Sequence, residues 1–249
     1  MHPGSIPGEA SSLMSPATAP FHLGREVVAT DAWAETHQRR RLGMVNGQLR
    51  TGGVVDQEAL AAFLEVPRER FVAKNFAALA YLDRDVPARG AKTRRLVAPL
   101  TLARMIQAAA VKPGDRALDV GGGSGYGAAI LNRMGAKVVL LESDPGAAAV
   151  AREELAGTTA EAIEGRLDAG FEAAAPFDVI VIEGAFEVFP ATLFAQLSDG
   201  GRLVGIDATS GAYKAVLIEK DGEAMSRRAL MELKADVLDG FQLKASFVF

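Results

Sequence analysis

The 249-residue sequence contains no cysteine, which excludes disulfides, thiolate-bound zinc and a cysteine nucleophile. Its three histidines, His2, His22 and His37, all lie near the start of the chain. The residues after His37 therefore provide no histidine general base and no Ser-His-Asp triad. Asp31, Glu35 and His37 are close in sequence but lack a metal-ligand spacing such as HExxH, so we expect no metal site.

Long apolar runs and a surplus of positive charge are also missing. No run approaches the ~18 apolar residues of a membrane span, and the first residues lack the basic and apolar regions of a signal peptide. We therefore expect a cytoplasmic protein that does not bind membranes. The net charge of −4 at pH 7 disfavours nucleic-acid binding, which depends on neutralising phosphates. With 49% hydrophobic residues, the chain can bury one sizeable α/β core.

Composition and pattern divide the chain into three regions. Residues 1–30 are rich in Pro, Ser, Gly and Ala and have few large apolar side chains, which predicts a flexible tail. Residues 31–98 form a helical N-terminal region, and residues 99–249 carry the strand and helix pattern of an α/β domain. Start and stop signals in the N-terminal region predict helices at Asp31–Arg50, Asp56–Pro67 and Lys74–Leu82.

A glycine-rich segment between two apolar runs is the strongest local feature. Ala117–Val120 is predicted to be a buried strand, Tyr126–Met134 a helix, and Lys137–Leu141 a second strand that ends in Glu142. Four glycines fill the turn between the first strand and the helix: Gly121, Gly122, Gly123 and Gly125. Because they carry no Cβ atom, a ligand can approach the main chain and the helix N-terminus there. Glu142 is placed to accept hydrogen bonds from a ribose.

Two cofactor templates fit this turn. Gly123, Gly125 and Ala128 match the GxGxxA dinucleotide spacing, which leaves a nicotinamide oxidoreductase open. Together with Asp119 and Gly121, however, the turn resembles the DxGxGxG signature of S-adenosylmethionine (SAM) methyltransferases. In that signature the acid lies near the ammonium group of SAM, whereas an added carboxylate would oppose a pyrophosphate. Asp119 therefore favours SAM as the cofactor.

Six segments together resemble the protein-L-isoaspartate O-methyltransferase family. They are MVNGQLRTGGVVD (Met44–Asp56), VPRERFV (Val66–Val72), ALAYLDRDVP (Ala78–Pro87), KPGDRALDVGGGSGYGAA (Lys112–Ala129), FDVIVIEGAFEVFP (Phe177–Pro190) and QLSDGGRLV (Gln196–Val204). The resemblance covers roughly residues 44–249. It implies an α/β, Rossmann-like fold, namely a seven-stranded SAM-methyltransferase sheet with an N-terminal helical lid. The later pattern agrees, with strands expected at Asp178–Ile182, Arg202–Ile206, Lys214–Glu219 and Lys244–Phe249 and a helix at Pro190–Leu197.

The resemblance implies methyl transfer from SAM to a carboxylate, that of L-isoaspartyl residues in damaged proteins or peptides. No base is needed, because a carboxylate with an ordinary pKa near 4 is ionised at pH 7. Proximity and alignment in a water-poor site then supply the rate. A SAM enzyme with another acceptor and a non-catalytic protein that binds SAM or a partner remain open.

The same resemblance implies a set of cofactor-binding residues. They are Asp119, Gly121, Gly123, Ser124, Gly125, Tyr126, Glu142, Ser143, Arg166, Leu167, Asp168 and Glu183. The family's GDG segment, whose acid contacts adenine, aligns with Gly165, Arg166 and Leu167 here. Arginine cannot accept a hydrogen bond from the adenine amino group, so Asp168 or the main chain takes that role. Glu183 replaces a residue that is usually small or a hydroxyl and faces the pocket.

The substrate loop departs from the family pattern. Where the family has a GQTIS(A/Q)P-like segment whose hydroxyls help to hold the isoaspartyl group, this chain reads GAKTRRLVAP over Gly90–Pro99. The family serine becomes Val97 when the segments are anchored on Ala98 and Pro99. The expected substrate-binding residues are Thr93, Arg94, Arg95 and Val97. The two arginines either replace the lost hydroxyl as carboxylate ligands or block the old site.

Overall fold

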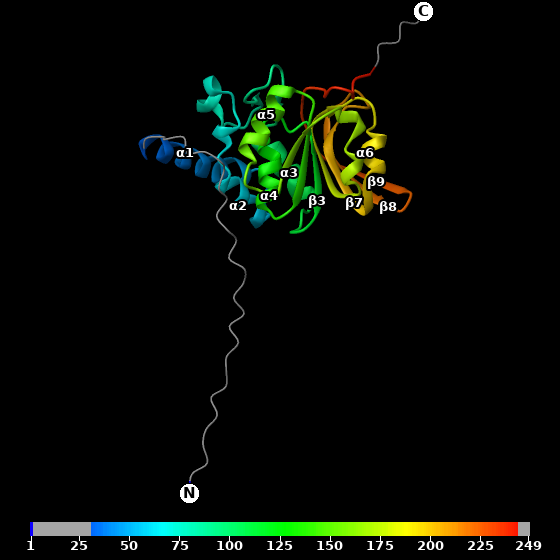
Figure 1. Ribbon diagram of the computed structural model, residues 1–249, viewed down its shortest axis with the longest axis horizontal. Coiled ribbons are helices and arrows are strands. Elements are labelled where there is room, and N and C mark those ends of the chain that lie inside the picture. The colour runs from blue at the N-terminus through cyan, green and yellow to red at the C-terminus, as the bar shows by residue number, and fades with distance from the viewer. Residues whose placement is uncertain (2–30, 244–249) are drawn as a thin grey trace, which may run out of the picture.

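The computed structural model describes Met1 and residues 31–243, arranged as a twisted sheet with helices against it (Figure 1). The predicted tail, apart from Met1, and the predicted strand Lys244–Phe249 lie outside these residues. No helix within residues 31–243 is long and apolar enough to cross a membrane.

The sheet has seven strands in the order β5-β4-β3-β6-β7-β8-β9. They are β3 (Arg116–Val120), β4 (Lys137–Glu142), β5 (Glu161–Glu164), β6 (Phe177–Phe186), β7 (Leu197–Asp207), β8 (Lys214–Asp221) and β9 (Ala224–Glu232). The first five run parallel, and β8 and β9 are antiparallel to their neighbours. The fold class expected from the sequence is thereby confirmed. Strand β9 was not predicted, because it is an edge strand whose residues are mostly exposed and show no alternation.

Successive side chains of each strand point to opposite faces of the sheet and so contribute to two apolar layers. Ala117 and Val179 belong to the layer on one face, and Leu118 and Ile180 to the layer on the other. Helices α3 (Pro99–Ala109), α4 (Tyr126–Arg133) and α5 (Pro145–Glu154) contribute to the first layer, and α6 (Ala191–Ala195) to the second. The sheet is therefore covered on both faces, as a parallel sheet requires.

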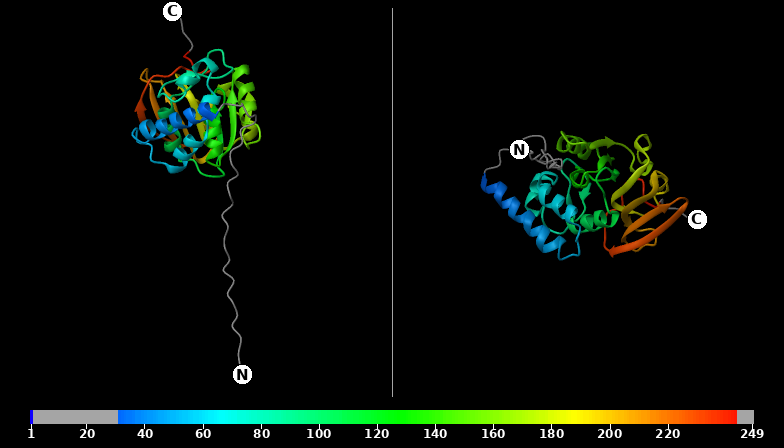
Figure 2. Two further views of the ribbon diagram at one scale, coloured as in Figure 1. Left: turned by 90° about the vertical axis from the view of Figure 1, so that its left-hand side faces the viewer. Right: turned by 90° about the horizontal axis from the view of Figure 1, so that it is seen from below.

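The N-terminal region packs behind the first layer, on the side of the molecule away from β8 and β9 (Figure 2). Its elements are α1 (Asp31–Met44), the π-helix η1 (Val45–Leu49), α2 (Gln57–Glu65), the 3₁₀ helices η2 (Arg68–Arg70) and η3 (Lys74–Leu79), and the strands β1 (Val86–Pro87) and β2 (Arg95–Leu96). Asp56 caps α2 as expected, since its Oδ1 accepts a hydrogen bond from the Ala59 amide at 3.1 Å. Phe63 of α2 packs edge-on to Tyr126 of α4. The region thus shares one core with the sheet.

At the carboxyl end of the sheet, the glycine turn after β3 meets residues from near the C-terminus. The chain leaves β3 towards β4 on one side, and β6 pairs with β3 on the other, so this is the topological switch point where ligands bind α/β sheets. Residues 233–243, here called the C-terminal strap, cross this end: Val237 forms a parallel bridge with Ala185. Leu238 of the strap is buried, and a Cβ atom at Gly121 would lie 2.9 Å from its Cδ1.

The shared core predicts that the N-terminal region unfolds together with the sheet. Phe63→Ala removes a fully buried aromatic ring and should lower the free energy of unfolding by about 3 to 5 kcal/mol in one cooperative urea transition. Leu64→Ala, next to it but 40% exposed, is the matched control and should change stability by less than about 1 kcal/mol. A separate early transition in the wild type, with the sheet unaffected by Phe63→Ala, would contradict a shared core.

Candidate cofactor and acceptor site

The glycine turn between β3 and α4 is held in place by a hydrogen bond to the N-terminal region. Gly123 and Gly125 have φ angles of +62° and +96°, which other residues rarely adopt. Ser124 is fully buried, and its hydroxyl donates a hydrogen bond to the carbonyl of Phe71 in the N-terminal region. This hydroxyl therefore links the turn to the N-terminal region and does not point towards a ligand. Tyr126, the first residue of α4, is also fully buried.

Asp119 lies directly under the turn, at the carboxyl end of β3. It is completely buried, and neither carboxylate oxygen has a well-formed hydrogen bond among the described residues, although the Glu183 carboxyl and the Ala128 amide lie close to it. A Cβ atom at Gly122 would collide with this carboxylate, which explains the glycine there. Burial, and then the negative charges of Glu183 and Glu142, hold the pKa of Asp119 well above its ordinary range. A buried acid without a partner is costly unless a proton or a cation neutralises it.

Glu183 of β6 is a second buried acid beside Asp119. It is 2% exposed, and its Oε1 has no hydrogen-bond partner among the described residues. A Cβ atom at Gly127 would collide with this Oε1 and would lie 3.2 Å from Asp119 Oδ2, so both acids face the same point of α4. Burial raises the pKa of Glu183 to about 7, and the positive charge of Arg68 offsets part of that rise.

Glu142, at the end of β4, is buried but well satisfied. Its Oε2 accepts from the Gly123 amide at 2.8 Å, and its Oε1 accepts from the Ser143 and Asp144 amides at 2.7 and 2.9 Å. Arg94 adds a charged contact, with Nε 3.3 Å from Oε1. A ribose that binds to Glu142 must therefore exchange with some of these donors, and the side-chain donors are Arg94 and, at 3.5 Å, the Ser143 hydroxyl.

Arg94 lies over the glycine turn rather than in an open substrate groove. Its Cγ is 3.2 Å from the position of a Cβ atom at Gly123, and its side chain is 10% exposed. Besides Glu142, its Nη2 contacts Ser143 Oγ at 3.2 Å and Asp239 Oδ2 of the strap at 3.4 Å. Arg94 thus links the β1–β2 loop, the end of β4 and the strap across the predicted ribose site.

The residues expected near adenine lie beside the turn. Arg166 forms a two-point pair with Asp168, with nitrogen to oxygen distances of 2.7 and 3.1 Å. This pair lowers the pKa of Asp168. Leu167 between them is buried, and its Cδ1 is 3.5 Å from a Cβ position at Gly121. Leu167 is therefore the member of this group that contacts the glycine turn.

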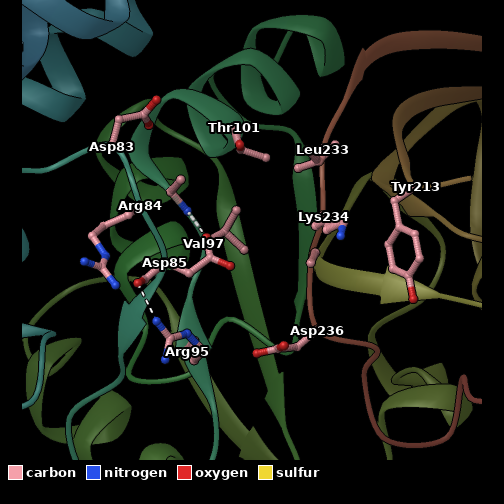
Figure 3. A pocket seen from close by; sticks show the side chains of 12 residues that line it. Asp83, Arg84, Asp85, Arg95, Val97, Thr101, Tyr213, Leu233, Lys234 and Asp236 are labelled. Atoms are coloured by element: carbon pink, nitrogen blue, oxygen red, sulfur yellow. Dashed lines mark hydrogen bonds between the residues drawn. The ribbon is translucent and has the colours of Figure 1, made fainter.

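Two neighbouring cavities open on the other side of Arg94, with volumes of about 730 and 180 Å³. Five residues line both cavities: Asp85, Arg95, Val97, Ala235 and Asp236. In the larger cavity Asp85 and Arg95 lie opposite Asp236 of the strap (Figure 3). Arg95 donates to the Asp85 carbonyl at 2.6 Å, and Asp85 Oδ1 accepts from the Ala98 amide. Thr93, Arg94 and Glu183 line the smaller cavity, so it connects the expected substrate residues with the buried acids.

The site matches a cationic ligand better than a dinucleotide. Asp119 is a buried carboxylate without a partner, in a turn whose Cβ atoms are missing, and it would repel a pyrophosphate at that place. An ammonium group would satisfy it. Within residues 31–243 no group of three His, Cys, Asp or Glu side chains could hold a metal ion.

Comparison with known proteins gives a consistent result. The sequence model described as protein-L-isoaspartate(D-aspartate) O-methyltransferase (PCMT) matches residues 40–234. The chain belongs to this family. A protein-L-isoaspartate O-methyltransferase of Koribacter versatilis is 40% identical over 66% of this chain and 74% of its own length. The one from Herpetosiphon aurantiacus is 32% identical over 82% of this chain and 90% of its own length.

Solved structures with the family name have the same fold. A protein-L-isoaspartate O-methyltransferase superposes with a TM-score of 0.72 and 26% identity, covering 80% of this chain and 66% of that chain. A Plasmodium falciparum methyltransferase in complex with S-adenosyl-L-homocysteine gives a TM-score of 0.67 over 82% of this chain and 98% of that chain. Its 20% identity is evidence for the fold alone.

Arg68, in the family segment VPRERFV, was missed by the sequence analysis. Its side chain is fully buried and lies 4.7 Å over the Tyr126 ring. Its Nη2 donates to the Val97 carbonyl at 2.8 Å, while Nε and Nη1 have no partner among the described residues. Arg68 therefore places a positive charge behind the two unpaired acids. The composition of the segment gave no signal that this arginine is buried.

The buried acids predict a pH-dependent stability. The pKa of Glu183 is about 7 in the folded protein and near 4.5 when exposed, so the folded state holds an extra proton between these values. Stability should therefore fall as pH rises from about 4.5 to 7. Glu183→Gln, which cannot ionise, should remove about 2 to 3 kcal/mol of this loss when urea unfolding is measured at pH 5 and pH 8. The exposed Glu219→Gln is the control. An equal pH dependence in Glu183→Gln and wild type would contradict the assigned shift.

Proposed function

We propose that the protein is a SAM-dependent O-methyltransferase that methylates the carboxylate of L-isoaspartyl residues in proteins or peptides. The observation that carries the proposal is the unpartnered, fully buried Asp119 under a glycine turn, at the switch point of a sheet from this family. The names of its relatives supply the substrate class.

The proposed cofactor-binding residues differ in the interaction that each offers to SAM. SAM, when bound, supplies a methyl group on a positively charged sulfur. Asp119 offers a carboxylate to the ammonium group, and Glu142 offers one to the ribose once Arg94 has moved. Gly121 and Gly123 have no Cβ atoms, and the side chains of Leu238 and Arg94 pack directly against them. A ligand that binds to the main chain of this turn displaces those two side chains, while Leu167 gives it an apolar contact. Ser143, Arg166 and Asp168 complete the ligand set, with Asp168 or the main chain on adenine.

The acceptor residues lie in the two cavities. A substrate carboxylate needs no base, so the chain's task is to bind it, orient it and exclude water. Arg95 can orient a carboxylate, because it lines both cavities and carries a guanidinium group. Thr93 is exposed at the edge, where a residue on a protein chain could enter. We assign residues 31–98 mainly to the acceptor side and residues 99–243 to the cofactor side.

The proposal extends to partners and location. We infer a protein or peptide acceptor, no nucleic-acid or membrane partner, and action in the cytoplasm. The net charge of −4 supports the choice of protein over nucleic acid. The family's activity on proteins supports it as well.

The test is a methyl-transfer assay with an isoaspartyl peptide and its ordinary aspartyl counterpart at saturating SAM. Wild type should methylate only the isoaspartyl peptide. Arg95→Ala should raise the KM of that peptide about tenfold or more, through loss of a charged donor, and leave SAM affinity within about twofold. Arg94→Ala should instead tighten SAM binding severalfold in calorimetry, because it removes the cation that covers Glu142.

The outcomes separate the alternatives. A wild type that binds SAM but methylates neither peptide would point to another acceptor or to a non-catalytic role, and heat with NAD but none with SAM would overturn the cofactor. Equal effects of the two arginine variants on peptide KM would contradict the division between cofactor and acceptor sides.

A further inference from the structure

We propose that Glu183 is an acceptor-binding residue, whose protonated carboxyl donates a hydrogen bond to the substrate carboxylate. This inference rests on the proposed function and adds to it the donor that the substrate loop no longer supplies at Val97.

The first observation that supports this inference is the position of Glu183. It lies at the carboxyl end of β6, with Asp119 on one side and the smaller cavity on the other. Val97 lines the same cavity and offers no donor. The guanidinium of Arg94 is engaged with Glu142, Ser143 and Asp239. Arg95 uses its Nη2 on the Asp85 carbonyl and remains the charged donor proposed above, so Glu183 acts as a second donor beside it. Glu183 lines this cavity as well, although its unpartnered Oε1 is turned towards Gly127 of α4, so donation to the acceptor falls to the other oxygen of the carboxyl.

The charges around Glu183 favour its protonated form. The charged and titratable groups packed around it are Asp119 of β3, Glu142 of β4, Arg68 of η2, Arg94 of the β1–β2 loop and Tyr126 of α4. The smaller cavity adds Asp85, Arg95 and, from the strap, Asp236 and Asp239. Burial raises the pKa of the Tyr126 hydroxyl well above 10, so that group is neutral. With Glu183 included, six carboxyls then face three guanidinium groups, and this surplus of negative charge favours protonation of the buried acids. When the ammonium group of the cofactor neutralises Asp119, Glu183 is the buried acid that still needs a proton.

A carboxylate acceptor strengthens this preference. An ionised Glu183 would repel a second carboxylate in the same cavity, whereas a protonated carboxyl donates an O–H bond to one of its oxygens and leaves the other free to react. A buried carboxylic acid kept neutral for donation is a known device in enzymes. Glu183 keeps its proton throughout, because methylation of an ionised carboxylate releases none from the acceptor.

The test measures binding of the isoaspartyl peptide to protein saturated with S-adenosyl-L-homocysteine, by calorimetry at pH 6, 7, 8 and 9. Wild-type affinity should fall up to tenfold per pH unit above pH 7, with proton uptake visible as a dependence on buffer ionisation enthalpy. Glu183→Gln, whose amide donates without a proton to lose, should bind at the wild-type pH 6 level at every pH. Glu183→Ala should bind about 10 to 100-fold more weakly throughout. Glu219→Gln, on the exposed part of β8, should behave as wild type.

Folding is checked separately, since Glu183 is buried. Each variant should unfold in one cooperative thermal transition, and its peptide affinity is compared only at S-adenosyl-L-homocysteine concentrations that saturate that variant. The same pH dependence in Glu183→Gln as in wild type would overturn the inference, and so would an unchanged affinity in Glu183→Ala. If wild type binds the isoaspartyl peptide but does not methylate it, the proposed reaction is overturned. The role of Glu183 in binding is then still decided by the binding data.

Discussion

The structure depends on how three buried carboxyls are neutralised at the carboxyl end of one sheet. Glu142 is satisfied by main-chain amides and Arg94, whereas Asp119 and Glu183 have no hydrogen-bond partner for the oxygens they bury. Burying unpaired acids is costly, so the surroundings must supply a proton or a cation. The glycines at 122 and 127 make room for these acids, and Arg68 is buried behind them. The strongest charges of the site are thus arranged for a positively charged ligand.

Segments far apart in the sequence complete the site. The β1–β2 loop supplies Arg94, and the C-terminal strap supplies Asp239 and packs Leu238 onto the glycine turn. Arg94 contacts both Glu142 and Asp239, so one guanidinium joins the β1–β2 loop to the end of β4 and to the strap. In our account two arginines stand where the family has a hydroxyl-bearing substrate loop: Arg94 contacts Glu142, Ser143 and Asp239, and Arg95 donates to the Asp85 carbonyl.

Local sequence signals predicted the central strands and the glycine turn. They did not predict the edge strand β9 or the side chains that pack around the turn from distant segments. The run from β3 through the glycine turn to β4 combines a buried strand, turn glycines and a helix stop, and its predicted boundaries agree with the structure to within a residue or two. Strand β9 lacks such a signal because it is an exposed edge. The place of Arg94 over the turn and the burial of Arg68 depend on contacts between distant segments. Composition alone would leave both arginines in solvent.

The most direct test of the central claim, that Asp119 binds the ammonium group of the cofactor, is a calorimetric titration of SAM into wild type and Asp119→Asn. Asparagine keeps the size of the side chain and removes its charge. The account predicts that the dissociation constant rises about 10 to 100-fold, corresponding to the loss of a charged hydrogen bond, while the thermal stability of the variant without cofactor is at least that of wild type. Equal affinity of the two proteins for SAM would contradict it.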